Sequence, residues 1–387
     1  MIQNFKELDK EYVANTYGRF DLLIERGKGS LVYDETGKEY IDLSTGIAVN
    51  TFGVCDDGVK NAVLAQLDKV QHTSNLYYSE PCILLAQTLC ERTGAKKVFF
   101  GNSGAEANEC AIKVARKWAD DKKGFGHSKI ITLQNSFHGR TVTTLSATGQ
   151  DVFHQHFHPF TGGFVHVAVG DLAAVETEMK TGEVAAVFVE LVQGEGGVMP
   201  LEKEFVQGLV SLCEKYDALF MVDEVQTGNG RSGALYAYQK FGVTPDVVTT
   251  AKGLGGGLPL GATLLFEKVQ GVLDVGSHGS TFGGNPVACA AALSVLSRID
   301  DVLLKEVEEK SELIFSSLSG AKGVKSVSGM GLMIGVETEK PVGEVLAACM
   351  EKGILPIKAK NKLRLLPALN IEKELLEKAL NVLKECL

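Results

Sequence analysis

Apolar runs alternate with segments of helical periodicity along the middle of the chain. The runs lie at residues 96–100, 129–133, 163–169, 184–191, 218–225 and 246–250. Between them, stretches such as EANECAIKVARKWA place their apolar residues on one face of a helix. Strands separated by helices are typical of a mostly parallel sheet with helices on both faces. The pattern therefore predicts an α/β fold that binds its ligand at the carboxyl ends of the strands.

The two ends of the chain show other patterns. SLVYD and KEYIDL, separated by a short turn, predict a hairpin. Near the C-terminus, VGEVLAACMEKG predicts a helix that stops at Gly353, ILPIKA and KLRLLPAL predict strands, and EKELLEKALNVLKECL predicts a closing helix. We expect these terminal parts to pack together as a small α/β domain. The expected organisation is an N-terminal segment 1–50 that joins the small domain, a large domain 51–300, and a C-terminal small domain 301–387.

Composition narrows the class of protein. The chain has 387 residues, more than the ~100–200 of a typical domain, which favours two domains. No apolar run approaches the ~20 residues of a membrane span, and the first residues lack the apolar stretch of a signal peptide. We therefore expect a soluble, cytoplasmic protein without a membrane partner. The formal net charge of −9 disfavours nucleic acid as a partner.

The cysteine and histidine residues indicate neither disulfide bonds nor a complete metal site. The 8 cysteines are scattered and form no Cys-x-x-Cys pair, which indicates free thiols in a reducing compartment. In FHQHFHPF, His154, His156 and His158 alternate, so on a strand they would share one face and could hold a metal. We interpret the stretch as an aromatic loop and expect no metal.

Polar groups follow the first two apolar runs. After 96–100, GNSGAEANE opens a helix in which Ser103 and Glu106 have the spacing of a capping box. A glycine-flanked helix start exposes backbone N–H groups to an anion such as phosphate, although a plain helix cap would use the same residues. After 129–133, QNSFHGRT supplies an aromatic ring, an imidazole and a guanidinium.

Carboxylates follow two further runs. Glu190 lies at the end of one apolar strand, Glu195 lies between two glycines, and Asp223 follows another apolar strand. A buried carboxylate must be paired or hydrogen-bonded. For Glu190 and Glu195 a structural ion pair explains the pattern as well as a functional role does. For Asp223 the partner is either a protein cation or a protonated nitrogen of a ligand.

Lys252 is surrounded by glycines in VVTTAKGLGGGLPLGA. The order Ala-Lys-Gly does not match a phosphate-binding loop, in which glycine precedes the lysine. Its separation of 29 residues from Asp223 suits one strand–helix–strand step, so both side chains can reach the same crevice. A phosphate cradle, an aromatic ring, a buried carboxylate and an approachable amine together complement the phosphate, ring, pyridine nitrogen and aldehyde of pyridoxal phosphate (PLP).

These motifs resemble those of the class III aminotransferases, a family of PLP enzymes with fold type I. The resemblance runs nearly from end to end and is most specific in GNSGAEANE, FHGRT, VELVQGEGGV, MVDEVQTGNGRSG, TTAKGLGGGLPLGA and GSTFGGNPVACAAA. Within the family, the chain most resembles members that move the δ-amino group of N-acetylornithine to 2-oxoglutarate in arginine biosynthesis. The motifs that favour these members are NTYGRF, FHGR, QGEGG and DEVQTG. Those members produce N-acetylglutamate semialdehyde and glutamate. Transamination of free ornithine, succinylornithine or 4-aminobutyrate remains the alternative.

Two readings from other classes are weaker. A PLP-binding regulatory module without turnover would need Lys252 and Asp223, but not two arginines and a carboxylate for substrates. A dinucleotide-binding oxidoreductase would rest on GMGLMIG at residues 329–335. That run has one residue too many for the Gly-x-Gly-x-x-Gly fingerprint.

The resemblance also implies how the cofactor is held. Ser103, Gly104 and Ala105 would bind its phosphate, together with Thr281 from the second subunit of a homodimer whose active sites lie at the interface. Gln226 would bond to the ring oxygen.

The ring and the reacting aldehyde would have further partners. Phe137 and Val225 would pack on the two faces of the ring, and Asp223 would bond to the pyridine nitrogen. Lys252 would bond to the aldehyde and then carry the proton between substrate and cofactor.

The substrates would be bound by a second set of residues. Arg364 would hold the α-carboxylate of glutamate or 2-oxoglutarate, with Glu195 as its movable partner. Arg140 would bind the other carboxylate, and Tyr17 would lie near the bound amino acid.

Overall fold

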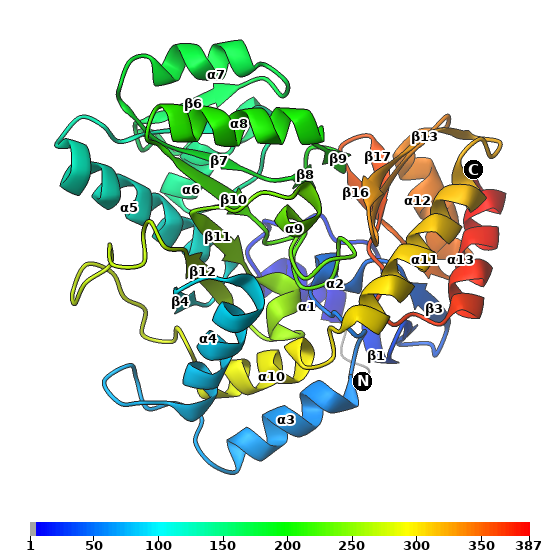
Figure 1. Ribbon diagram of the computed structural model, residues 1–387. Helices are drawn as coiled ribbons and strands as arrows, with labels where there is room; N and C mark the ends of the chain where they lie inside the picture. The colour runs from blue at the N-terminus through cyan, green and yellow to red at the C-terminus, as the bar shows by residue number, and fades with distance from the viewer. Residues whose placement is uncertain (1–4) are drawn as a thin grey trace.

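The computed structural model describes residues 5–387, and a seven-stranded sheet forms its centre (Figure 1). All neighbouring strands pair in parallel except β12, which runs antiparallel to β11 and β4. In spatial order the strands are β4 (Lys97–Gly101), β12 (Gly261–Leu265), β11 (Val247–Thr250), β10 (Leu219–Asp223), β7 (Val184–Val189), β5 (Lys129–Leu133) and β6 (Phe164–Val167). The mostly parallel sheet predicted from the sequence is therefore confirmed.

Helices cover both faces of this sheet. Alternate strand residues such as Ile130 and Met221 pack with the apolar side of α5 (Gly104–Lys123). Their neighbours Ile131 and Val222 belong to the larger core that includes the residues of α8 (Lys203–Lys215). The other helices and short elements of this part are α2 (Thr45–Ala48), α3 (Asp57–Leu67), α4 (Glu80–Thr93), α6 (Val142–Ala147), η1 (Asp151–Phe153), α7 (Leu172–Met179), β8 (Val192–Gln193), β9 (Met199–Pro200), α9 (Tyr238–Phe241), η2 (Lys252–Gly255) and α10 (Pro286–Leu296).

Segments from the two ends of the chain form a smaller α/β unit. One sheet has the order β1-β2-β3-β15, in which the C-terminal β15 pairs in parallel with β3 of the predicted hairpin. The second has the order β13-β14-β17-β16. The elements are β1 (Ile24–Lys28), β2 (Leu31–Asp34), β3 (Glu39–Asp42), α11 (Asp301–Leu318), β13 (Val324–Met330), β14 (Met333–Thr338), α12 (Val342–Glu351), β15 (Ile354–Leu355), β16 (Ile357–Ala359), β17 (Lys362–Leu365) and α13 (Lys373–Cys386).

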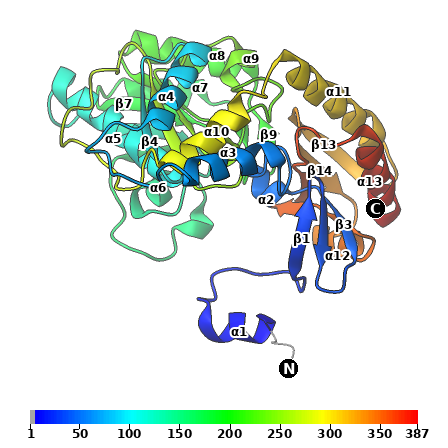
Figure 2. The same ribbon diagram turned by 90° about the horizontal axis from the view of Figure 1, so that it is seen from below.

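The packing of the terminal segments agrees with the expected small domain. The boundaries 1–50, 51–300 and 301–387 stay a prediction, and the first four residues of the first segment lie outside the described part of the chain. Near the N-terminus, α1 (Phe5–Tyr12) buries none of its residues and lies away from the body of the molecule (Figure 2). Among residues 5–387, no helix combines the length and the apolar character needed to cross a membrane.

Arg231 joins the two parts of the molecule. It lies in the segment after β10, and its buried guanidinium donates to the carbonyl oxygens of Leu332 and Pro367 in the C-terminal unit. In return, the backbone N–H of Leu332 donates to the carbonyl of Arg231 at 2.9 Å. Burial lowers the pKa of Arg231 to about 9. These bonds hold β17 next to the segment that follows β10.

Candidate active site

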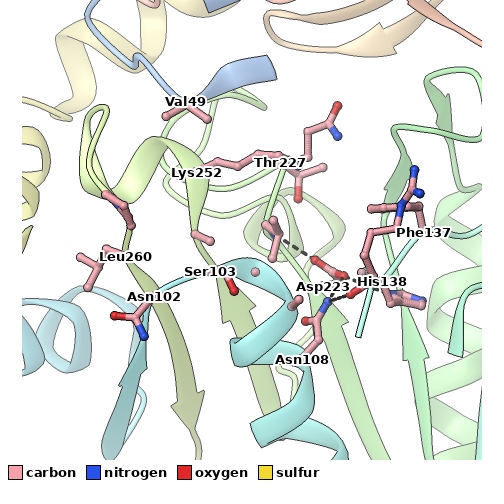
Figure 3. A pocket seen from close by; sticks show the side chains of 18 of the residues that line it. Val49, Asn102, Ser103, Asn108, Phe137, His138, Asp223, Thr227, Lys252 and Leu260 are labelled. Carbon is pink, nitrogen blue, oxygen red and sulfur yellow. Dashed lines mark hydrogen bonds and ion pairs between the residues drawn. The ribbon is translucent and has the colours of Figure 1, made fainter. Parts of the chain in front are cut away.

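A cavity of about 450 Å³ lies where several strands of the large sheet end (Figure 3). The segments that follow β4, β5, β10 and β11 all contribute to its wall, as the position of the polar groups along the sequence predicts. The predicted site residues that line it are Ser103, Gly104, Ala105, Phe137, Arg140, Asp223, Val225, Gln226 and Lys252.

The first turn of α5 forms one wall of the cavity. Ser103 is the N-cap residue, and its Oγ accepts the backbone N–H of Glu106 at 3.2 Å, which is one of the two bonds of a capping box. The Glu106 carboxylate accepts the backbone N–H of Asn102 at 2.6 Å, instead of the N–H of Ser103 that a complete capping box would use. At Gly104, a Cβ atom would lie 2.7 Å from Val225 Cγ1, so only glycine lets the helix start this close to Val225. The free N–H groups and positive dipole end of a long helix thus face the cavity.

Asp223 ends β10 with only 4% of its surface exposed. Its Oδ2 accepts Asn108 Nδ2 at 2.8 Å and lies 2.8 Å from His138 Nδ1 (Figure 3). Its Oδ1 accepts the backbone N–H of Val225 at 3.0 Å. Since one oxygen is held by two side chains, the carboxylate is fixed in orientation, and Oδ1 retains a lone pair for a further donor.

His138 and Asn108 were not predicted from the sequence as partners of Asp223. The His138 ring stacks on Phe188 with 4.5 Å between centroids and an interplanar angle of 17°. Its Nε2 is buried without a hydrogen-bond partner within residues 5–387, and the same holds for Asn108 Oδ1. The position of His138 directly after Phe137 was visible in the sequence, but its distance of 85 residues from Asp223 gave no signal of contact.

Glu190 lies just beyond β7 and also lines the cavity. Its carboxylate accepts the backbone N–H groups of Phe137 at 2.8 Å and Gly194 at 3.3 Å. Burial raises the pKa of Glu190 to about 7. Glu190 therefore links the segment that carries Phe137 to the loop that carries Glu195. The sequence marked this carboxylate as hydrogen-bonded or paired, and the structure provides backbone donors.

Lys252 begins η2 directly after β11, with a positive φ of 47°. A non-glycine residue in this region of backbone conformation is uncommon, and such strain clusters at functional sites. Burial lowers the pKa of Lys252, while the charge of Asp223 opposes the shift. A lowered pKa increases the share of neutral amine, the form that acts as nucleophile and base.

Two of the neighbouring glycines explain the unusual setting of this lysine. At Gly253, a Cβ would lie 2.7 Å from Thr51 Oγ1, which donates to the Gly253 carbonyl at 2.8 Å. At Gly256, a Cβ would lie 2.7 Å from Val295 Cγ2 on α10. The glycines therefore let other segments pack tightly around the lysine backbone.

Arg364 on β17 lies beside the cavity and is almost fully buried. Its Nη1 donates to Glu195 Oε1 at 2.6 Å and to Gln226 Oε1 at 3.0 Å. Gln226 lines the cavity, so its hydrogen bond connects the Arg364 guanidinium to the site. The pairing expected between Arg364 and Glu195 is present, while their roles toward substrates stay predictions.

Three of the predicted site residues have exposed side chains, and two of these three lie outside the cavity. Arg140 lines the cavity but is exposed, with its guanidinium over the rings of Phe137 and Phe153. Tyr17 is 70% exposed and does not line the cavity. Thr281 is also exposed and outside the cavity of its own chain. Their roles toward substrate and cofactor stay predictions.

No group of three or more His, Cys, Asp or Glu side chains in the described part of the chain could hold a metal ion. The segment that contains His154, His156 and His158 is irregular apart from the short η1 turn, as expected for an aromatic loop. The alternating histidines do not form a strand face.

The residues around the cavity fit pyridoxal phosphate. The first turn of α5 suits the phosphate, and Phe137 and Val225, which both line the cavity, offer apolar surface for a flat ring. Asp223 Oδ1 offers an acceptor for a protonated ring nitrogen, and Lys252 supplies the amine for an aldehyde. The donor set thus matches each functional group of the cofactor.

Comparisons with known proteins point to one family. The family model described as aminotransferase class-III matches residues 12–387. The acetylornithine aminotransferase of Haemophilus ducreyi is 51% identical, over 99% of this chain and 98% of the relative. The succinylornithine transaminase of Yersinia pseudotuberculosis is 47% identical, over 84% of this chain and 81% of the relative.

Solved structures agree with this grouping. The ornithine aminotransferase of Toxoplasma gondii superposes with a TM-score of 0.95 at 33% identity, covering 99% of this chain and 94% of the other. The N-acetylornithine aminotransferase of Stenotrophomonas maltophilia superposes with a TM-score of 0.86 at 36% identity, covering 98% and 97%.

Proposed function

Because this chain belongs to the class III aminotransferases, we propose that it transfers the δ-amino group of N-acetylornithine to 2-oxoglutarate, with pyridoxal phosphate as cofactor. The products are N-acetylglutamate semialdehyde and glutamate. The observation that carries this proposal is the Arg364–Glu195 ion pair beside the cavity of Lys252. In this pair Arg364 can bind a carboxylate of one substrate, and Glu195 can neutralise Arg364 when the other substrate is bound. Near full-length similarity to acetylornithine aminotransferases supports the choice of acyl group.

Pyridoxal phosphate supplies an electron sink when bound, and the protein must orient it and keep its ring nitrogen protonated. The first turn of α5, from Ser103 to Ala105, offers N–H groups to the phosphate. Asp223, whose carboxylate is fixed by Asn108 and His138, would hold the ring nitrogen. The ionised form of Asp223 would stabilise a positive charge on that nitrogen.

Lys252 moves the proton. Its lowered pKa favours the neutral amine, which can accept the proton from the substrate carbon that bears the amino group. The resulting ammonium lies near Asp223 and Glu195, whose negative charges stabilise it. The same lysine can then return the proton, so a single residue serves both directions of the transfer.

Two arginines and one glutamate handle the alternating substrates. Glutamate carries a carboxylate next to its reacting carbon, and Arg364 binds it after Glu195 has moved away. N-Acetylornithine reacts through its δ-amine and has no carboxylate there, so Glu195 stays on Arg364 and neutralises it. The exposed Arg140 binds the distal carboxylate of either substrate, with Tyr17 nearby. A buried guanidinium left without a partner would be costly, which makes the switch necessary.

The active form proposed is a homodimer in the cytoplasm, acting in arginine biosynthesis. Exposed apolar side chains support an interface: Leu76 is 87%, Tyr78 is 98% and Phe282 is 59% exposed. The two loops that carry them are joined by Asn75, whose Nδ2 donates to the carbonyls of Ser280 and Gly283. Large exposed apolar groups gathered in one region mark interaction surfaces. Thr281 lies in this region, from which it would serve the phosphate bound to the partner.

A panel of amino donors assayed with 2-oxoglutarate tests the function. N-Acetylornithine should have the highest kcat/KM, ahead of succinylornithine, free ornithine and 4-aminobutyrate. A higher kcat/KM for another donor would identify that donor as the substrate and would leave the reaction class unchanged. Absence of glutamate formation from every donor would favour a regulatory PLP-binding protein instead.

A further inference from the structure

The aromatic loop after α6 has no role in the proposed function, yet it contacts Arg140. The Arg140 guanidinium carbon lies 4.5 Å from the ring centroid of Phe153 and 5.5 Å from that of Phe137. The two rings meet edge to face, with 5.8 Å between centroids and an interplanar angle of 67°. Phe153 therefore contacts both Phe137, which lines the cavity, and the exposed guanidinium of Arg140.

The aromatic contacts leave the donor groups of Arg140 free. Within residues 5–387 its guanidinium has no hydrogen bond to an acceptor and no ion pair with a carboxylate. A carboxylate partner would compete with a substrate carboxylate for the guanidinium N–H groups. An aromatic face attracts the cation without accepting those N–H groups. Phe153 can thus restrict where Arg140 lies while leaving it ready to bind.

The loop that carries Phe153 is attached to the rest of the domain. The backbone N–H of Phe153 donates to Gln150 O at 3.0 Å, and Gln150 Nε2 donates to Ser136 O at 3.0 Å. On the other side, His154 Nε2 lies 2.9 Å from Leu145 O in α6. Phe153 is half-buried between these anchors. Its ring is therefore a fixed platform for the flexible arginine side chain.

We propose that Phe153 is a positioning residue that determines how strongly the site binds a distal carboxylate. Its ring holds the Arg140 guanidinium at the mouth of the cavity, where it meets the α-carboxylate of N-acetylornithine or the γ-carboxylate of 2-oxoglutarate. This inference rests on the substrate role of Arg140 in the proposed function. Without the platform, Arg140 must lose more side-chain freedom on binding, so affinity falls while the chemistry at Lys252 is unchanged.

Substitution of Phe153 by leucine in the holoenzyme tests the proposal. The dissociation constant for glutarate, a dicarboxylate that cannot react, should rise about three- to fivefold, the size expected for an exposed cation–π contact. The KM for N-acetylornithine should rise by a similar factor, with kcat within about twofold of the unaltered enzyme. Phe153→Tyr keeps a ring and should restore both values. Phe157→Leu is the matched control, because Phe157 lies in the same loop, is 69% exposed and does not contact Arg140.

A double-mutant cycle shows whether Phe153 acts through Arg140. Arg140→Met should weaken glutarate binding more than Phe153→Leu does, and adding Phe153→Leu to Arg140→Met should cause no further loss. Fully additive effects, or an unchanged glutarate constant in Phe153→Leu, would overturn the inference. An unchanged constant in Arg140→Met would overturn it as well. The proposed function is judged separately, by turnover of N-acetylornithine in the unaltered protein.

Discussion

Arg364 Nη1 lies 2.6 Å from Glu195 Oε1, in an ion pair that joins β17 of the small unit to the loop after β8 of the large one. The arginine side chain is almost fully buried, while that of Glu195 is 32% exposed. The glutamate can therefore move toward solvent, whereas the guanidinium cannot. This asymmetry is what a site needs if one substrate carboxylate is to replace Glu195 on a fixed arginine.

Removing the charge of Glu195 should change the balance between the two half-reactions. In Glu195→Gln, Arg364 loses its anionic partner, so the α-carboxylate of glutamate has only a neutral amide to displace. The ratio of kcat/KM for glutamate to that for N-acetylornithine should rise about tenfold, the scale of one hydrogen bond to a charged group. Single-turnover absorbance measurements of each half-reaction give the ratio. Glu204→Gln, on the exposed start of α8, is the control, and equal changes in both half-reactions would argue against a switch.

Neutralising Asp223 should impair the chemistry more than the fold. Asp223→Asn keeps the shape of the side chain but loses the charge that stabilises a protonated ring nitrogen. Cofactor should be retained, with kcat at least about 100-fold lower, as for other preorganised electrostatic groups. Asp246→Asn is the matched control, because Asp246 accepts the backbone N–H of Phe220 at 2.9 Å but does not line the cavity. A normal kcat with reduced thermal stability in Asp223→Asn would assign Asp223 a structural role only.

The raised pKa of Glu190 makes stability depend on pH. Its native pKa of about 7 lies above the ordinary 4.5, so the native state keeps a proton that the unfolded chain loses between these values. The contribution of this carboxyl to stability therefore falls as pH rises from 4.5 to 7. Desolvation is the main cause, with His138 favouring and Asp223 opposing the charged form.

Glu190→Gln cannot ionise and should lack this dependence. The melting temperature of the variant minus that of the unaltered protein should increase between about pH 5 and about pH 8. Glu312→Gln on the exposed side of α11 should show no such trend. A difference that stays constant across the range would mean that Glu190 is ionised throughout in the native protein.

Hybrid dimers can test whether Thr281 acts on the partner's cofactor. Thr281→Ala must first be shown to lower cofactor occupancy. Lys252→Ala chains are then mixed with Thr281→Ala chains and assayed at limiting PLP. If Thr281 acts across the interface, one site per hybrid is intact and the other carries both changes, so activity should exceed the average of the two parents. Activity equal to that average would place Thr281 at its own chain's site.

Local pattern was sufficient to find the residues that lie where strands end. Ser103, Asp223 and Lys252 each follow an apolar run, and parallel strands bring their carboxyl ends to one edge of the sheet. The alternation of runs and helices likewise predicted the sheet, and the hairpin pattern predicted β2 and β3. These features depend on residues close together in the sequence.

Contacts between distant segments could not be read from such patterns. His138 and Asn108 bond to Asp223 from a different strand end and a helix, and neither position has a distinctive sequence signal. Glu190 bonds to backbone N–H groups, which every residue except proline carries. The platform of Phe153 under Arg140 depends on how one irregular loop folds back.

The rate of glutamate formation from N-acetylornithine by Lys252→Ala measures how far the reaction depends on this lysine. The variant should fold and bind cofactor, but its rate should fall by at least about a thousandfold, because both the covalent attachment and the proton transfer are lost. Lys325→Ala, at an exposed position on β13, should retain the full rate. A Lys252→Ala enzyme that works near the rate of the unaltered protein would mean that Lys252 is neither the attachment point of the cofactor nor the group that transfers the proton.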